Sequence, residues 1–330
     1  MTAFAANECV GVIVPMHNAQ DTIAETLDSI CRQSHRALDI VVVDDGSVDR
    51  SNQIVTEMAR GDPRIRLVHQ ANAGVAAARN RGACETGADI LAFVDADDIW
   101  APEKIAAQIE ALKQCPGPAL VYCWFAQIDA CSRAYPVYVN RLIEGEVLAE
   151  ICRNNFVGNG SSLLVPRDIF ERVGGFDPSL HANRAQGCED LLFCASAARL
   201  YPFKVVPRYL LGYRITHRNM SSDTARMLRS FDLVAARIKT EVPQYAALWT
   251  EHRRSFLLWL ARRAVMAGRV AEGAALANQA AANSKGTRWE VVRDLGTTWL
   301  KSRLLPPWAK DVAVRARLSP QRLNYQELAW

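Results

Sequence analysis

The chain has 330 residues, of which half are hydrophobic and 22% are charged, a composition that favours a globular protein and excludes a disordered or fibrous one. This length exceeds the usual size of a single domain, so we expect one large domain with an extension, or two domains. The net charge of +4 is unevenly distributed, because residues 201–330 carry 22 Lys and Arg against 9 Asp and Glu, whereas residues 1–200 carry 17 against 26.

Short apolar runs alternate with helical patterns through the first part of the chain. Each run is continuously apolar, as in a strand that is covered on both faces, and the segments between the runs place apolar residues at helical spacing. The expected strands are 10–15, 40–43, 65–68, 90–94 and 120–125. This series predicts an α/β fold of the Rossmann-like kind, with a mostly parallel central sheet flanked by helices.

Polar residues follow three of these runs at the points where the strands end. Asn18 follows the first run, the Asp44-Asp45 pair ends the second, and the acidic segment 95–98 follows the fourth. Ligands of parallel sheets bind beyond the carboxyl ends of the strands. We therefore expect these three loops to converge on one crevice.

The regular alternation weakens after about residue 140. Two loops with glycines, at 158–162 and 174–177, are followed by a helix that starts near Glu189 and by short strands around Val205 and Leu211. Beyond Ser221 the chain is rich in Ala, Leu and Arg and has little turn chemistry, which predicts a helical extension to the carboxyl end. The expected units are a domain at 1–220, with halves at about 8–125 and 126–220, and the extension at 221–330.

The basic extension has three candidate roles. Four arginines, Arg253, Arg254, Arg262 and Arg263, lie beside Phe256, Leu257, Trp259 and Leu260. Such helices can rest on a membrane, pair with another subunit, or cover the core of their own chain. We expect a weak peripheral membrane contact through these basic helices, with an ordinary solvated surface as the alternative.

Cysteine usage and the lack of targeting signals suggest a location. Nine scattered cysteines form no C-x-x-C pair, which indicates reduced thiols. The sequence has no signal-like amino terminus and no apolar stretch of membrane-spanning length. We therefore expect a cytoplasmic protein, peripheral on the inner membrane face if the basic helices bind there.

The segment Asp95-Ala96-Asp97-Asp98 outlines a site for a hard metal ion. A strand end directs at least two of its carboxylates the same way, and Mg²⁺ or Mn²⁺ binds few protein carboxylates and completes its shell with diphosphate oxygens and water. A solvated acidic loop is the alternative. The fingerprints of dinucleotide-binding and P-loop proteins, G-x-G-x-x-G after the first strand and G-x-x-x-x-G-K-[ST], do not occur.

Six motifs occur in a characteristic order along the chain. They are V-I-V-P-M-H-N, V-V-D-D-G-S-V-D, N-A-G-V-A-A-A-R-N-R-G, F-V-D-A-D-D-I-W, V-G-G-F-D and C-E-D-L-L-F. In these motifs the chain resembles the family 2 glycosyltransferases, which have the GT-A fold and invert configuration. The resemblance covers about residues 8–220, is strongest up to Trp100, and does not include the extension.

The resemblance implies a set of residues that bind a nucleotide-sugar. Asp45 matches the aspartate that contacts the uracil ring in similar enzymes, and Arg79 matches an arginine near the base and the diphosphate. Capping of the next helix is the alternative for Asp45 and for Asp44, and an exposed salt bridge is the alternative for Arg79. The whole set is Pro15, Asn18, Asp44, Asp45, Arg79, Asp95 and Ala96.

The resemblance also implies a metal ligand and a general base. Asp97 matches the direct metal ligand, Asp95 matches a ligand of the ribose or metal, and Asp98 is expected to cap a helix. Asp190 matches the base that deprotonates the acceptor, with an acidic first helical turn as the alternative. The segment from Tyr213 to Ser221 resembles one that closes over the donor. It contains a second candidate metal ligand, His217, and the acceptor side is assigned Glu189, Gly160 and Asp177.

These assignments predict a metal-dependent inverting glycosyltransferase. Mn²⁺ or Mg²⁺ would neutralise the departing diphosphate while Asp190 takes the proton of the attacking hydroxyl. The expected donor is a UDP-sugar, the expected acceptor is a glycan or lipid-linked glycan, as in cell-surface polysaccharide synthesis, and no nucleic acid partner is expected. A non-catalytic nucleotide-sugar or glycan-binding module is the alternative. A phosphatase fits poorly, because that class carries D-x-D on its first strand.

Overall fold

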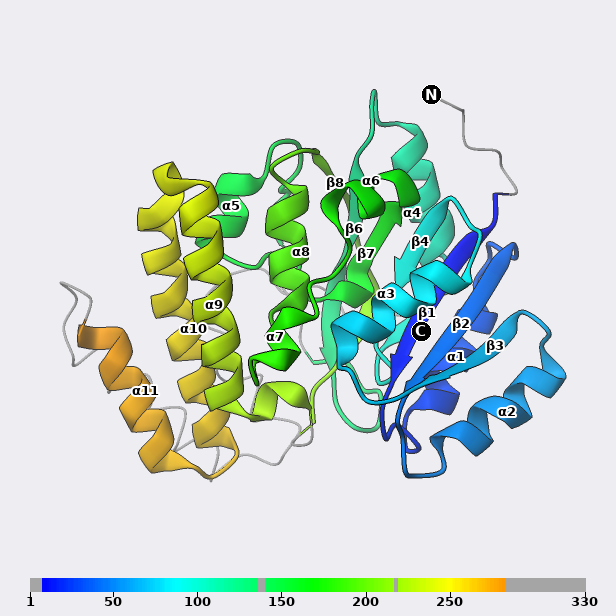
Figure 1. Cartoon of the computed structure of the whole chain (residues 1–330), viewed down its shortest axis with the longest axis horizontal. Helices are drawn as coiled ribbons and strands as arrows, with labels where there is room; N and C mark the ends of the chain where they lie inside the picture. Colours follow the sequence, from blue (N-terminus) through cyan, green and yellow to red (C-terminus); the bar gives the residue numbers. More distant parts are fainter. Residues whose placement is uncertain (1–7, 136–139, 217–218, 283–330) are drawn as a thin grey trace.

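The computed structural model describes residues 8–135, 140–216 and 219–282, which form one eight-stranded sheet with helices on both faces and a group of helices at one end (Figure 1). The strand order is β3-β2-β1-β4-β7-β6-β8-β5. Four of the seven strand pairings are parallel, so the predicted α/β fold with a mostly parallel sheet is confirmed.

The first half of the sheet is parallel throughout. Strand β1 (Val10–Met16) lies between β2 (Leu38–Asp45) and β4 (Ile90–Phe93), and β2 also pairs with β3 (Ile65–Gln70). These strands coincide with four of the predicted apolar runs. Their carboxyl ends therefore meet at one edge of the sheet, as the sequence predicted.

The second half of the sheet is mixed. Strand β7 (Leu163–Pro166) runs antiparallel to β4 and to β6 (Leu120–Ile128), and separates the two. Strand β8 (Phe203–Arg214) is parallel to β6, and the short β5 (Ile99–Trp100) is antiparallel to β8. Strand β7 was not among the expected strands, because four residues after a glycine-containing loop give too little pattern for a strand.

The two short strands expected around Val205 and Leu211 are one strand, β8. Pro207 lies between them, and proline has no backbone N–H to donate to a sheet. The pairing of β6 with β8 shifts register at this point, from Val206 opposite Cys123 to Tyr209 opposite Trp124. Because of this irregularity, the hydrogen bonding between β6 and β8 resumes after the proline, so the strand continues where the sequence suggested a break.

Alternating side chains of β1 face two hydrophobic clusters. Val10, Val12 and Val14 belong to one cluster and Ile13 to the other, which is the period of two that a strand imposes. The first face is covered by α1 (Ile23–Cys31), α2 (Ser51–Gly61) and α4 (Lys104–Lys113). The second face is covered by α3 (Val75–Glu85), α6 (Arg167–Val173) and α8 (Glu189–Ala197).

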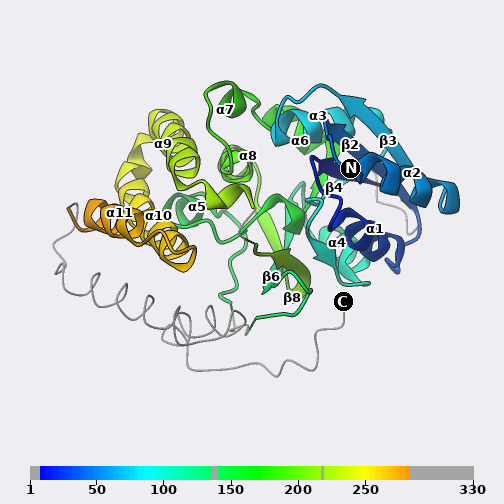
Figure 2. The ribbon, with the colours of Figure 1, turned by 90° about the horizontal axis from the view of Figure 1, so that it is seen from below.

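The chain after the sheet is helical, as predicted for the extension. It forms α9 (Thr224–Glu241), α10 (Ala246–Met266) and α11 (Val270–Ala282), which share a hydrophobic cluster with α8 and α5 (Leu148–Arg153). Both views place α9 and α10 beyond α8, on the side away from β1, β2 and β3 (Figures 1 and 2). Residues 283–330 of the predicted extension lie outside the described residues.

The apolar side of α10 packs onto the chain itself. Leu257 and Leu260 are buried, and the rings of Phe256 and Trp259 pack partly against the same cluster. Of the three roles expected for this segment, these side chains serve the third, covering their own core. Within the described ranges, no helix combines the length and the apolar character needed to cross a membrane.

The remaining elements are short. They are α7 (Ser179–Ala182) and three 3₁₀ turns at Gly160–Ser162, Met220–Ser222 and Pro243–Tyr245.

Candidate functional site

A pocket of about 1070 Å³ opens at the carboxyl ends of β1, β2 and β4 and extends past the start of α8 to α10. It is the larger of the two best-formed pockets in the described part of the chain. The strand-end loops converge here, as the sequence predicted. The predicted site residues that line it are Pro15, Asn18, Asp45, Arg79, Asp95, Ala96, Asp97, Glu189 and Asp190.

Asp45 ties the end of β2 to the start of α3. Its Oδ1 accepts hydrogen bonds from the backbone N–H of Ala73 and the side-chain amide of Gln70, both at 2.8 Å, and its Oδ2 accepts one from the N–H of Gly74 at 2.9 Å. Gly74 has a φ of +89°, a conformation that residues with a Cβ rarely adopt. The carboxylate is therefore fixed at the wall of the pocket.

Asp44, the neighbouring residue, does not line the pocket. Its carboxylate accepts hydrogen bonds from the N–H of Ser47 (2.9 Å) and the amide of Asn52 (3.0 Å), and its Oδ2 lies 3.2 Å from Nδ1 of His69. Burial alone would raise the pKa of Asp44, but these hydrogen bonds lower it overall. Adjacent side chains of a strand point to opposite faces, so only one member of the Asp-Asp pair reaches the ligand side.

Asn18 shapes the loop that follows β1. It has a φ of +51°, and its Oδ1 accepts a hydrogen bond from the N–H of Val48 at 2.9 Å. Its own N–H donates to Oγ of Ser47 at 3.0 Å. Asparagine tolerates this left-handed conformation better than most residues. The loop after β1 is thereby fastened to the loop after β2.

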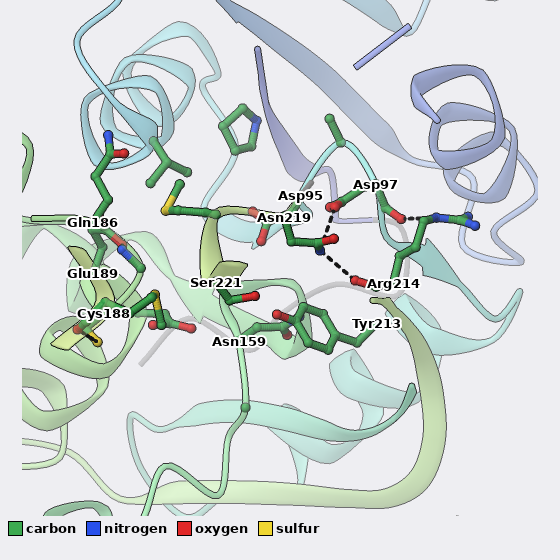
Figure 3. A pocket seen from close by; sticks show the side chains of 18 of the residues that line it. Asp95, Asp97, Asn159, Gln186, Cys188, Glu189, Tyr213, Arg214, Asn219 and Ser221 are labelled. Atoms are coloured by element: carbon green, nitrogen blue, oxygen red, sulfur yellow. Dashed lines mark hydrogen bonds between the residues drawn. The ribbon is translucent and has the colours of Figure 1, made fainter. Parts of the chain in front are cut away.

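Asp95 and Asp97 follow β4 and face the pocket together (Figure 3). Oδ1 of Asp95 accepts a hydrogen bond from the guanidinium of Arg79 at 2.5 Å, and Oδ2 of Asp97 accepts one from the amide of Asn219 at 3.2 Å. Burial, and then the nearby charge of Asp95, raise the pKa of Asp97 to about 7. Burial and the charge of Asp95 thus outweigh the positive charge of Arg214, which lowers the pKa of Asp97.

Ala96 contributes its backbone rather than its side chain. Its carbonyl accepts hydrogen bonds from the hydroxyls of Thr22 (2.9 Å) and Thr26 (3.1 Å), at the start of α1. These bonds hold the turn between the two aspartates against α1. The turn is therefore anchored by residues about 70 positions earlier in the chain.

Asp98 does not cap a helix, contrary to the sequence prediction. Helix α4 begins at Lys104, and the residue at its cap position is Glu103. The buried carboxylate of Asp98 accepts hydrogen bonds from the amide of Asn159 (3.0 Å), the hydroxyl of Ser161 (2.6 Å) and the N–H of Arg214 (3.0 Å). It joins three chain segments beneath the pocket, which no local pattern could reveal.

Arg79 is buried beneath the acidic residues, and the exposed salt bridge considered as its alternative is excluded. Only 4% of it is exposed, and its guanidinium lies 4.9 Å from the centre of the Phe176 ring. Burial would lower the pKa of Arg79, but Asp95 and then Asp190 outweigh it and raise the pKa. Gly160 is not in the pocket lining, yet a Cβ there would lie 3.1 Å from Nη2 of Arg79. Gly160 therefore makes room for this arginine.

Glu189 and Asp190 form the first turn of α8, on the other side of Arg79. Glu189 is 3% exposed, and its Oε2 accepts a hydrogen bond from the N–H of Gly187 at 2.8 Å. Asp190 accepts one at Oδ1 from the N–H of Leu191 at 2.7 Å. Burial raises the pKa of Asp190 to about 7, with Arg79 opposing the shift and Glu189 adding to it.

One further predicted residue, Asp177, is not brought to the pocket. Asp177 accepts hydrogen bonds from the N–H of Ser179 (2.8 Å) and the guanidinium of Arg237 (2.5 Å), so it ties α7 to α9. This is a structural contact, although the sequence assigned Asp177 to the acceptor side. His217 lies outside the described residues.

Several pocket residues were not predicted from the sequence to line the site. Asn219 and Arg214 lie in the segment 213–221 that was assigned to closure over the donor, but neither was given a role of its own. His252, Phe256 and Trp259 come from α10, where Phe256 and Trp259 were expected only as part of the basic helices. Arg214 is also tied to the acidic turn. It is 1% exposed, and its Nε donates to the carbonyl of Asp97 at 2.7 Å (Figure 3). Only the tertiary fold places these side chains here, so no pattern in the sequence marks them.

The acidic side of the pocket has donors that fit a hard cation. Among the described residues, no group of three or more His, Cys, Asp or Glu side chains forms a metal cluster. Mg²⁺ and Mn²⁺ do not require one, since one or two carboxylates and phosphate oxygens suffice. The Asp97 carboxylate faces the pocket, and a cation bound beside it would lower its raised pKa and favour the ionised form.

The chain is similar to a family of known proteins. Residues 11–174 match the family model described as "Glycosyl transferase family 2". The chain is 32% identical over 171 residues to "Uncharacterized glycosyltransferase EpsJ" of Bacillus subtilis, covering 50% of this chain and 49% of that relative. It is 26% identical over 227 residues to "Uncharacterized glycosyltransferase alr2836" of Nostoc, covering 66% and 68%. The chain thus spans about half the length of the first of these relatives.

Solved structures show the same fold. The S. aureus TarS fragment 1-349 superposes with a TM-score of 0.59 at 18% identity, covering 93% of this chain and 88% of that one. The mannosyltransferase PcManGT from Pyrobaculum calidifontis, in complex with GDP-Man and Mn²⁺, gives 0.57 at 20% identity, covering 93% and 84%. The predicted GT-A fold is therefore confirmed.

Proposed function

Because this chain belongs to the family 2 glycosyltransferases, we propose that it is a metal-dependent inverting enzyme that moves a sugar from a UDP-sugar to a hydroxyl of a glycan or lipid-linked glycan. The observation that carries the proposal is one pocket with two acidic sides. Asp95 and Asp97 lie on one side, Asp190 lies on the other, and the buried cation of Arg79 interacts with Asp95 and Asp190. The biological setting that suits such an acceptor is the synthesis of cell-surface polysaccharide.

The strand-end loops are our proposed site for the nucleotide. A carboxylate accepts about four hydrogen bonds, and Asp45 takes three from its own chain, which leaves one position for an N–H of the base. The ring of Pro15 and the side chain of Asn18 line the same end of the pocket. Asp95 and the backbone of Ala96 lie next along the pocket, where we place the ribose and diphosphate.

Asp97 is our proposed ligand for Mn²⁺ or Mg²⁺, and His217, outside the described residues, is a second candidate. When bound, such a cation would neutralise charge that builds on the departing diphosphate. Arg214 holds the Asp97 carbonyl at 2.7 Å, and Asn219 donates to its carboxylate at 3.2 Å. Both contacts orient Asp97 toward the pocket before any ligand enters.

Asp190 is our proposed general base. A carboxylate with a pKa near 7 is well matched to accept a proton at neutral pH. Its free oxygen takes the proton of the acceptor hydroxyl as that oxygen bonds to the anomeric carbon. The bond from the anomeric carbon to the diphosphate oxygen breaks on the opposite face, so one displacement inverts the configuration. Glu189 lies beside the base, and its charge adds to the raised pKa of Asp190.

Release of UDP from UDP-sugars tests the activity. The purified chain is incubated with UDP-glucose, UDP-galactose, UDP-N-acetylglucosamine or GDP-mannose, with and without Mn²⁺, and the released nucleotide is measured by chromatography. We expect Mn²⁺-dependent release of UDP from one of the UDP-sugars. Release of GDP from GDP-mannose, with no release of UDP from any UDP-sugar, would contradict the proposal that the donor nucleotide is UDP. No release, together with retained UDP binding, would favour a non-catalytic nucleotide-sugar-binding module.

Membrane contact and a cytoplasmic location remain predictions. The apolar side chains of α10 that the sequence offered to a membrane lie in the core or the pocket of this chain, so they do not support the contact. Sedimentation of the full chain with vesicles of anionic phospholipid at low salt tests it. We expect weak binding that salt reverses, and no binding at low salt would contradict the prediction.

A further inference from the structure

The pocket is larger than one substrate requires. Its volume of about 1070 Å³ lies just above the range of about 300–1,000 Å³ that is usual for ligand pockets. The strand-end loops and Asp190 account for only part of its lining. The remainder comes mainly from β6 and β8, from the segments 154–159 and 181–188, and from one side of α10. Space on this side of the proposed base is where an attacking hydroxyl has to arrive.

Two aromatic rings of α10 face this space. Phe256 and Trp259 are one helical turn apart, both are half-buried, and both line the pocket. Their ring centres lie 5.4 Å apart, with an angle of 30° between the planes. Phe256 also stacks on the buried ring of Phe231 in α9, at 4.6 Å and 19°. The pair is therefore held in place by Phe231, and the guanidinium of Arg263 lies 5.4 Å from the centre of the Trp259 ring. The exposed parts of both rings belong to the pocket lining.

The wall beside the rings is held by a buried histidine. His252 is 3% exposed, and its Nε2 accepts a hydrogen bond from the N–H of Asn155 at 3.2 Å. That bond requires the neutral ring, with its proton on Nδ1. Asn155 belongs to the loop that leads to Gly158 and Asn159, which also line the pocket. One side of α10 thus supplies two rings and fixes the loop next to them.

We propose that Phe256 and Trp259 form a subsite for a pyranose ring of the acceptor, within the pocket assigned above to glycosyl transfer. A pyranose has one face of C–H bonds with partial positive charge, and an aromatic face is negative, so the two attract. The ring edges carry hydroxyls, which the exposed Ser255 and the amide-rich loop at Asn154 and Asn155 can bind. The inference rests on the proposed function for the position of Asp190 between donor and acceptor.

The position of the two rings and the polar groups beside them favour a sugar over a nucleotide base or a lipid chain at this subsite. A nucleotide base would be served by the Asp45 loop, on the far side of Asp190. A lipid chain needs a continuous apolar surface, whereas hydroxyl and amide groups lie beside the two rings. A surface that alternates aromatic faces with hydrogen-bonding groups matches a sugar, which alternates C–H faces with hydroxyls.

Saturation-transfer NMR on the full chain, with UDP and the diamagnetic Mg²⁺ present, tests the subsite. The probes are the methyl β-glycosides of glucose, galactose and N-acetylglucosamine, together with octyl β-glucoside below its micelle concentration. The variants are Trp259→Leu and Phe256→Leu. The matched control is Tyr201→Leu, a partly buried aromatic residue outside the pocket lining. Calorimetric titration of UDP into each protein checks that the donor half is intact.

We expect at least one pyranoside to receive saturation at its ring protons, with affinity about 2- to 10-fold lower in each pocket variant and unchanged in Tyr201→Leu. The absence of any pyranoside signal while UDP binds would overturn the subsite and leave the proposed function standing. Saturation of the octyl chain protons alone would show that the subsite binds a lipid chain, and would overturn the proposal of a pyranose subsite. Failure of the wild-type chain to bind UDP would count against the proposed function itself.

Discussion

The two sides of the pocket are built in different ways. On the side of the sheet, carboxylates stand at strand ends and are held by nearby loops, as Asp45 is held by the N–H groups of Ala73 and Gly74. On the side of α10, His252 and Trp259 come from the middle of a long helix. They reach the pocket only because that helix packs against α5 and α9.

The two sides of the pocket therefore supply different kinds of groups. The sheet side has fixed charges, and its geometry depends on short segments that lie close together. The helical side has rings and a neutral histidine, and its geometry depends on the packing of the whole extension. Substitutions on the sheet side are therefore expected to change rate or donor binding. Substitutions on α10 are expected to change acceptor binding and stability.

Replacement of the proposed base gives the largest expected effect. Asp190→Asn keeps the size of the side chain but cannot accept a proton, so we expect transfer to fall by about 10²- to 10⁴-fold. Binding of UDP should be unchanged, because the nucleotide site lies on the other side of Arg79. The matched control is Asp177→Asn, whose carboxylate ties α7 to α9 away from the pocket. Transfer by Asp190→Asn at the wild-type rate would disprove the assignment.

The raised pKa of Asp190 sharpens the same test through pH. With a pKa of about 7, the base is active only when ionised, so the transfer rate should rise about tenfold per pH unit below 7 and level off above it. A rate already at its plateau at pH 5 would contradict this assignment.

The stability of the folded chain should fall with rising pH, whereas the transfer rate should rise. The folded chain keeps the Asp190 proton up to about pH 7, whereas an unfolded Asp loses it near about pH 4. This group therefore lowers stability as pH rises through that window. Asp190→Asn should unfold at a higher temperature than the wild type at pH 8, and the difference should shrink at pH 5. Thermal unfolding at the two pH values measures it.

The Asp44-Asp45 pair tests whether only one of two adjacent carboxylates serves the ligand. Asp45→Asn should weaken UDP binding by about 10- to 100-fold, because a hydrogen bond to a charged group contributes about 1.5–3 kcal/mol. Asp44→Asn should leave UDP binding unchanged and lower stability instead, since it weakens the contacts to Ser47 and Asn52. Titration of UDP compares them, and equal losses would mean that Asp44 also serves the ligand.

His252 gives the smallest expected effect and reports on the helical side. His252→Ala leaves the part-buried N–H of Asn155 without its acceptor, at a cost of about 1 kcal/mol in the free energy of unfolding. Burial lowers the pKa of His252 to about 4, so the wild type should lose stability as pH falls from about 6.5 to 4. The variant should lose less over that window, as urea unfolding would show. A pH dependence equal to that of the wild type would exclude the neutral buried ring.

The sequence predicted the sheet side of the pocket better than the helical side. The parallel strands were visible as apolar runs, and Asp45, Asp95 and Asp97 stand where those runs end. Asp98 was misjudged, because its partners come from segments more than 60 residues away in the chain. Strand β7 was too short to recognise.

The residues of α10 show the same limit more clearly. Phe256 and Trp259 follow helical spacing, and such a pattern marks a buried side without saying what it covers. Only packing against Phe231 turns part of the pair toward the pocket. The sequence could therefore name the extension as helical but could not join it to the site.

We propose above all that the acidic side of the pocket binds a nucleotide together with a metal ion. Calorimetric titration of UDP into the full chain, with and without Mn²⁺ and beside Asp97→Ala, tests this most directly. We predict binding that requires both Mn²⁺ and Asp97, with Asp177→Asn behaving like the wild type. Equal UDP affinity in the presence and absence of Mn²⁺, or in Asp97→Ala, would contradict the account.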